Sequence, residues 1–268
     1  MIRFPGVGGV RHSTRERVTT MQRARRVAVT AVAAALAVTG LAACQNEPGV
    51  AAYVGDTRIT EERVDAIYTE ARDKLTASVQ RTGAEQGGQA PGAVEMPVTR
   101  RDIVTNLVGL DVLRGIAEQR NLQPAQIPVE QVAQGVGLPA DTEYVRTFSE
   151  YRGYLDAFAR TVTPAAPSDA DLMDVYERLK AGGAQTGGDF AAFKSSIGEQ
   201  DQQVLAENIG LRNALGEAAA AANARVNPRY GDAEMQLVTF RNEQGQTRPL
   251  VVLSFNAETG EPAVVDLP

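Results

Sequence analysis

The sequence predicts a mainly α-helical protein of the α+β class that ends in a small β-hairpin. Apolar residues recur at helical spacing, behind capping residues, from about residue 60 to residue 222. After Val226 the sequence pattern is that of a β-hairpin, with strands expected at 235–240 and 249–255 around a turn at 242–247. A short strand expected at 51–54 can join this β element.

The first expected helix runs from Thr60 to about Arg81. Thr60 suits the N-cap position, and Glu61 and Glu62 stand in the first turn, where the helix dipole favours acids. The apolar face of this helix would consist of Val64, Ile67, Tyr68, Ala71, Leu75 and Val79. A loop is expected at about 82–98, because this stretch is rich in Gly, Gln, Ala and Pro and lacks periodicity.

Two capping boxes mark further helices. Thr99 with Asp102 opens a helix to about Arg120, and Ser168 with Asp171 opens one to about Lys180. The remaining helices are expected at 129–136, from Asp141 or Thr142 until Pro164, around 190–197 and at 202–222, with a glycine-rich loop at about 181–188. The last of them would carry Val204, Ile209, Leu211 and Leu215 on its apolar face.

Residues 1–43 are predicted to be a secretory signal peptide. Arg23, Arg25 and Arg26 precede an uncharged apolar stretch at 27–40. This stretch is shorter than the roughly 20 residues that a membrane-spanning helix needs. Met21 is an alternative start, because residues 1–20 contain no apolar core.

The signal ends in Leu41-Ala42-Ala43-Cys44, which contains the only cysteine of the chain. This tetrapeptide resembles the lipobox of bacterial lipoprotein signals. The resemblance implies cleavage before Cys44, diacylglycerol on its sulfur and a lipidated tether at 44–50. The protein would then be anchored to the cell membrane on its extracytoplasmic face. The alternative is a plain signal peptide with a chance cysteine.

Composition narrows the possible functions of the remaining chain. Residues 1–43 hold seven of the 27 Lys and Arg residues and one of the 33 acidic residues, so the rest carries a net charge of −12. Such an acidic body is repelled by nucleic acids and by anionic lipid surfaces, so no nucleic-acid partner is expected. The only histidine, His12, lies in the predicted signal, which argues against nucleophile–histidine chemistry and most zinc sites.

No cofactor or metal is predicted either. Residues 135–140 match the letters of a dinucleotide-binding loop, but no strand precedes them. Pro139 stands where the helix should begin.

An aromatic stripe marks the helix that begins near Thr142. Two interpretations are open: the stripe is helix core, or it is a partly open groove that holds unfolded peptide through sequence-tolerant aromatic contacts. The candidate peptide-contact residues are Tyr144, Phe148, Tyr151, Tyr154 and Phe158.

The stretch AAYVGDTRITEERVDAIYTEAR (51–72) resembles the start of SurA-type periplasmic chaperones. The matching positions are Val54, Gly55, Asp56, Ile59, Thr60, Val64 and Asp65. The stretch VNPRYG (226–231) resembles the closing segment of actinobacterial lipoproteins of this group. The resemblance implies a chaperone module at 51–225, in which N- and C-terminal helical parts pack together, followed by a β element and tail at 226–268.

The same resemblance implies that the protein binds unfolded or nascent exported polypeptides. Many family members also carry a parvulin prolyl-isomerase domain, but 167–226 is too short for one and has no histidine. We therefore expect no catalysis. The alternatives are a prolyl isomerase with a degenerate site, and a scaffold lipoprotein with one folded partner.

Overall fold

The body begins with an antiparallel hairpin. In the computed structural model, which describes residues 48–85 and 94–255, strand β1 (Val50–Val54) turns at Gly55-Asp56 into β2 (Thr57–Thr60). β1 and the turn were predicted, whereas β2 was not. Only Ile59 of its four residues is buried, so its sequence carries almost no alternation.

Helix α2 (Glu61–Glu85) follows β2 without a break. Thr60 is the predicted cap, and its Oγ1 accepts a hydrogen bond from the backbone N–H of Arg63 at 3.1 Å. The helix extends beyond Arg81, so the predicted loop at 82–98 is wrong at 82–85. Residues 94–98 are non-helical, as expected, and 86–93 lie outside the described residues.

The other helices were largely predicted. Both capping boxes are confirmed, and Thr142 is the N-cap of the aromatic helix. The aromatic helix stops well before Pro164, and the last helix begins earlier than Gln202. Their bounds are α3 (Arg100–Arg120), α4 (Val129–Val136), α5 (Glu143–Ala159), α6 (Asp169–Ala181), α7 (Phe190–Ser196) and α8 (Glu199–Ala221).

The N-terminal strand pairs with a segment from the far end of the chain. β1 lies between β2 and β3 (Arg225–Val226), and Ala52 is opposite Val226. The hairpin of β4 (Glu234–Arg241) and β5 (Thr247–Ser254) forms a separate two-stranded sheet. The expected pairing of the N-terminal strand with this hairpin is therefore wrong, because β2 and β3 occupy both edges of β1.

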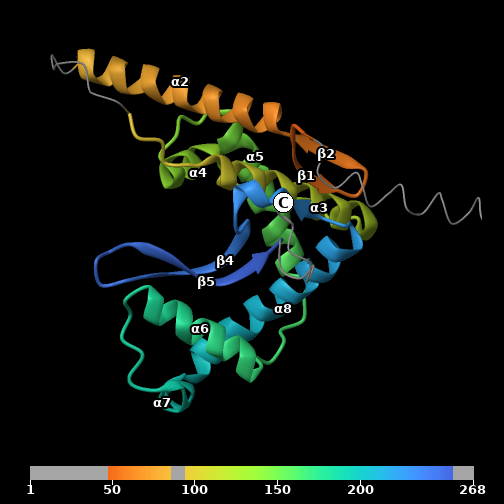
Figure 1. The fold of residues 1–268 in the computed structure, drawn as a ribbon, viewed down its shortest axis with the longest axis vertical. Helices are drawn as coiled ribbons and strands as arrows, with labels where there is room; N and C mark the ends of the chain where they lie inside the picture. Colours follow the sequence, from red (N-terminus) through yellow and green to blue (C-terminus); the bar gives the residue numbers. More distant parts are fainter. Residues whose placement is uncertain (1–47, 86–93, 256–268) are drawn as a thin grey trace, which may run out of the picture. The chain divides into compact units, whose positions relative to one another are not determined.

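A larger core joins the N- and C-terminal parts of the body. It is built from β1, α2, α3, α5, the second half of α8, β3 and Met235 of β4. Figure 1 shows that α3 and α8, which are distant in sequence, lie close together, and they are in direct contact. Among the described residues, both cores are built from positions between Ala51 and Phe255.

A smaller core lies between α6, α7, the first half of α8 and β5. Its buried residues are Leu172, Val175, Tyr176, Phe193, Leu205, Ile209 and Val251. Val204, which was expected on the apolar face of α8, is 41% exposed, and its neighbour Leu205 is buried instead. The other three predicted positions, Ile209, Leu211 and Leu215, are buried, so the predicted apolar face is wrong only at Val204.

Candidate functional site

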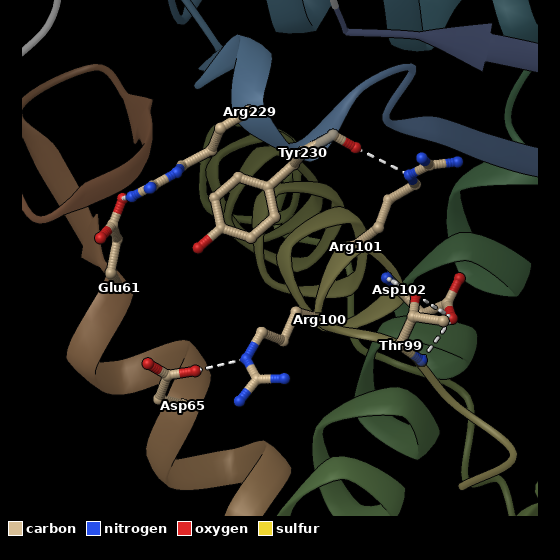
Figure 2. A pocket seen from close by; sticks show the side chains of 8 residues that line it. All are labelled: Glu61, Asp65, Thr99, Arg100, Arg101, Asp102, Arg229 and Tyr230. Atoms are coloured by element: carbon tan, nitrogen blue, oxygen red, sulfur yellow. Dashed lines mark hydrogen bonds and ion pairs between the residues drawn. The ribbon is translucent and has the colours of Figure 1, made fainter.

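A charged cleft lies where α2, α3 and the segment after β3 meet. It is lined by Glu61, Asp65, Thr99, Arg100, Arg101, Asp102, Arg229 and Tyr230, and its volume is about 730 Å³ (Figure 2). Both helices point their N-termini toward it, since Glu61 is the first residue of α2 and Arg100 the first of α3.

The segment after β3 is held in place by local hydrogen bonds. Asn227 accepts a hydrogen bond from Arg229 N through Oδ1 (3.1 Å) and donates from Nδ2 to the backbone oxygen of Val50 (3.0 Å). Residues 228–230 form the single 3-10 turn η2 (Pro228–Tyr230). It ends at Gly231, whose φ of +65° favours glycine. This turn brings Arg229 and Tyr230 against the two helix N-termini.

Three arginines hold the cleft together. Arg229 pairs with Glu61, and Arg100 pairs with Asp65 through Nε. Arg101 donates instead from Nε to the backbone oxygen of Tyr230 at 2.7 Å, and among the described residues no carboxylate pairs with it. Figure 2 shows the Tyr230 hydroxyl pointing into the space between Glu61 and Asp65.

The electrostatics of the cleft favour positive charge on the arginines and a neutral phenol on Tyr230. The hydrogen bond that Arg100 donates to Asp65 raises the pKa of Arg100, and the one that Arg229 donates to Glu61 raises the pKa of Arg229. Burial, and then the charge of Glu61, raises the pKa of Tyr230. The Tyr230 hydroxyl therefore keeps its proton and can donate it in a hydrogen bond.

The helix ends add to this positive potential. Each α-helix N-terminus carries roughly half a positive elementary charge. The Asp102 carboxylate is engaged in the cap of α3, since its Oδ2 accepts from the backbone N–H and the hydroxyl of Thr99, both at 2.7 Å. The three arginines of the lining stand against three carboxylates, so the groups that suit an anion are Arg101, which pairs with no carboxylate among the described residues, and the two helix ends. The described residues of its lining include no imidazole or thiol.

A second hollow continues the cleft along α2. It shares Glu61 and Asp65 with the first and is also lined by Gly49, Thr60, Glu62, Ala66 and Thr69. Gly49 directly precedes β1, so the cleft reaches the point where the predicted tether enters the body.

The aromatic stripe of α5 belongs mainly to the larger core. Tyr144 and Tyr151 are each 5% exposed and Phe158 is 1% exposed, so the groove interpretation is wrong at these three positions. Burial raises the pKa of both tyrosines. Phe148, which stacks on both tyrosines, and Tyr154 are partly exposed.

Cys44, the predicted lipid-attachment site, lies outside the described residues, as do His12 and the predicted signal peptide. Within residues 48–85 and 94–255, no helix has the length and apolarity to cross a membrane. The same residues contain no cluster of three or more His, Cys, Asp or Glu side chains that could hold a metal ion.

The cleft was missed at the level of sequence, although a signal for it exists. Thr60, Thr99 and Asp102 were recognised as helix caps, and 226–231 as a stretch of the family resemblance, but none of them was recognised as part of a site. Arg100 and Arg101 stand in the first turn of α3, where the helix dipole disfavours cations. A residue type that opposes the local helix preference is typical of a position with a tertiary or functional role.

Comparisons with protein-family models, curated proteins and solved structures found no match for this chain.

Proposed function

We propose that this chain is a lipid-anchored, extracytoplasmic protein of SurA-like type that binds unfolded or nascent exported polypeptides without catalysing a reaction. The observation that carries this proposal is the pairing of β1 with β3. It closes the N-terminal segment onto the C-terminal one around a common helical core, as the resemblance implies.

The cleft gives this closure additional support. Arg229 reaches Glu61 across 168 residues of sequence, and Arg101 reaches the backbone of Tyr230 across 129. The two stretches that carry the resemblance, 51–72 and 226–231, therefore contact each other directly. Such contacts are expected if both belong to one module.

Client contact would fall on the two partly exposed aromatic residues of α5, Phe148 and Tyr154, which offer apolar surface that tolerates many sequences. They lie six positions apart and so flank the buried stripe on opposite sides. Tyr144 and Tyr151 stack against Phe148, with ring centroids 5.7 and 5.5 Å away. Transient shielding of apolar segments at these two positions, on a body whose net negative charge keeps complexes soluble, is the proposed mechanism.

The test measures suppression of aggregation of an unfolded exported protein by the chain from Gln45 onward. We expect suppression that falls in the double variant Phe148→Ser, Tyr154→Ser. The control is Phe190→Ser, which removes a similarly half-buried aromatic from α7. No suppression at several-fold molar excess would count against client binding.

The anchor is tested separately in cells. Cys44→Ala should abolish labelling with a radioactive fatty acid and release the protein from the membrane. Unchanged labelling would exclude the lipobox. In a protease-coupled proline assay we expect no rate above the uncatalysed background. Crosslinking in cells should trap many clients, whereas a scaffold would trap one partner.

A further inference from the structure

The arginine cleft lies within short reach of the predicted lipid anchor. Gly49, which lines the hollow that continues the cleft, is the fifth residue after Cys44. An extended chain of this length spans at most about 18 Å. If Cys44 is acylated, the tether therefore keeps this side of the body close to the lipid headgroups.

From this reach and from the charge of the cleft, we infer that the cleft docks on the anionic phospholipid headgroups of the membrane that holds the anchor. This inference rests on the proposed anchoring at Cys44. The docking would fix which face of the body is turned to the membrane.

The chemistry of the cleft suits a phosphate group. Guanidinium groups bind phosphate oxygens through pairs of parallel hydrogen bonds. Arg101 is positioned by the hydrogen bond that its Nε donates to the backbone oxygen of Tyr230. Its charge is available to a phosphate, because no carboxylate among the described residues pairs with it. A Cβ at Gly231 would lie 2.9 Å from Nη2 of Arg101, so the guanidinium packs against the bare backbone of this glycine.

The neighbouring groups allow the same contact. In their ion pairs Arg100 uses Nε and Arg229 uses Nη1, so each keeps a further N–H edge for a phosphate. The neutral Tyr230 hydroxyl is a third donor beside them (Figure 2).

The acidic charge of the whole body does not prevent this docking. At physiological ionic strength charges are screened over about 8 Å. A surface held this close by a tether therefore responds mainly to the groups nearest to it. Those groups are three arginines, three carboxylates and two helix N-termini: Arg229 pairs with Glu61, Arg100 pairs with Asp65, and Asp102 is engaged in the cap of α3. Arg101 and the two helix ends therefore supply the local positive potential.

The experiment uses the only cysteine of the chain as a chemical anchor. The chain from Cys44 onward is coupled through its thiol to a maleimide-bearing lipid, so that the result does not depend on acylation in cells. Because the chain has no tryptophan, one introduced tryptophan can report contact with brominated lipid. Ala66→Trp places the reporter in the hollow beside the cleft, and Met173→Trp places it on an exposed position of α6.

We expect Ala66→Trp fluorescence to be quenched in vesicles that contain phosphatidylglycerol, and much less in pure phosphatidylcholine or at high salt. Met173→Trp should show little quenching in either. Equal quenching in both vesicle types, or at both reporters, would overturn the inference. Because these comparisons need no change to an arginine, they stand even if an arginine variant does not fold.

Arginine variants then assign the contact. Each arginine near an anionic surface contributes enough for about a fivefold change in binding, so Arg101→Gln should weaken docking about fivefold. Arg101→Lys should retain most of it. Arg152→Gln removes an exposed charge of α5 outside the cleft and should change docking less than twofold. Equal losses of docking from Arg101→Gln and Arg152→Gln would contradict a specific role for the cleft. Binding of an acidic peptide in the cleft, with no docking of the protein on the vesicles, would contradict it as well.

Discussion

The two cores of the body differ in size and in how far along the chain their parts are gathered. Among the described residues, the larger core holds 29 buried residues and draws on segments from both ends of the body, whereas the smaller holds 7 and draws mainly on α6 to α8. In the same part of the chain, the large apolar side chains that are clearly exposed, Met173 and Val204, lie on helices of the smaller core. Stability is rarely uniform across a protein, so the α6–α7 region should open before the larger core does.

The largest effect is expected from emptying the larger core. Phe158 is 1% exposed and lies among buried residues of α3 and α5, with the Arg120 guanidinium 5.1 Å from its ring centroid. Phe158→Ala should lower the free energy of unfolding by about 3–5 kcal/mol and affect the whole body. Urea unfolding followed by circular dichroism measures this free energy. A decrease of less than about 1 kcal/mol would show that the larger core does not contribute more to stability than the smaller one.

The matching change in the smaller core is Phe193→Ala. Phe193 packs against Tyr176 at 5.4 Å between ring centroids but lies at the edge of the body, at 8% exposure. We expect a cost of about 3 kcal/mol, at the low end for a phenylalanine. Hydrogen exchange should quicken in α6 and α7 while α3 keeps its protection. Equal loss of protection in α3 would mean that the two cores unfold together.

The joint between the cores can be tested at Gly210 in α8. A Cβ there would lie 2.5 Å from the backbone oxygen of Thr163 and 3.0 Å from the backbone nitrogen of Ala165. Backbone cannot move aside as a side chain can, so Gly210→Ala should cost about 1–3 kcal/mol. The control is Gly115→Ala in α3, where nothing lies within 4 Å; it should stabilise by up to about 1 kcal/mol. If both variants change the stability by the same amount, the packing of α8 against residues 163–165 leaves room for a methyl group.

The smallest effect concerns the cap of α6 and its dependence on pH. Burial alone would raise the pKa of Asp171, but hydrogen bonds from Ser168 and the ion pair with Arg212 hold it below its usual value. A carboxylate with a lowered pKa stabilises the fold above the unfolded value of about 3.9, and this contribution is lost as the pH falls through the folded value. Asp171→Asn should therefore cost about 1 kcal/mol at pH 7 and progressively less below pH 4.

Thermal unfolding at pH 7 and pH 3 measures this difference. Asp201→Asn changes an exposed first-turn acid of α8 and serves as the control. If the two variants lose the same stability at both pH values, the ion pair of Asp171 with Arg212 contributes nothing.

Much of the helical fold could be predicted, because local signals determine it. Two capping boxes predict helix starts from neighbouring residues alone, and both helices begin there: Thr99 with Asp102, and Ser168 with Asp171. The pairing of β1 could not be predicted in the same way. β3 is two residues long, and its register with Ala52 depends on packing between distant segments rather than on local preference.

The candidate site shows the same division. The stretches that line the cleft were recognised one at a time, but their convergence is a tertiary property. The position of the aromatic stripe on α5 was predicted, whereas its periodicity could not decide between core and groove. Tyr151 became core because α3 covers it closely, with Gly109 of α3 leaving room for its ring: a Cβ there would lie 3.0 Å from the ring.

The bond from Asn227 to Val50 joins groups that are 177 residues apart, and it has a consequence for the order of folding. A chain is delivered from its N-terminus, so β1 exists long before its partner β3. Until residues 225–226 arrive, one edge of β1 and part of the larger core have nothing to cover them. Contacts between such distant residues slow folding. A nascent copy of this protein is thus, for a time, itself an unfolded chain with an open strand.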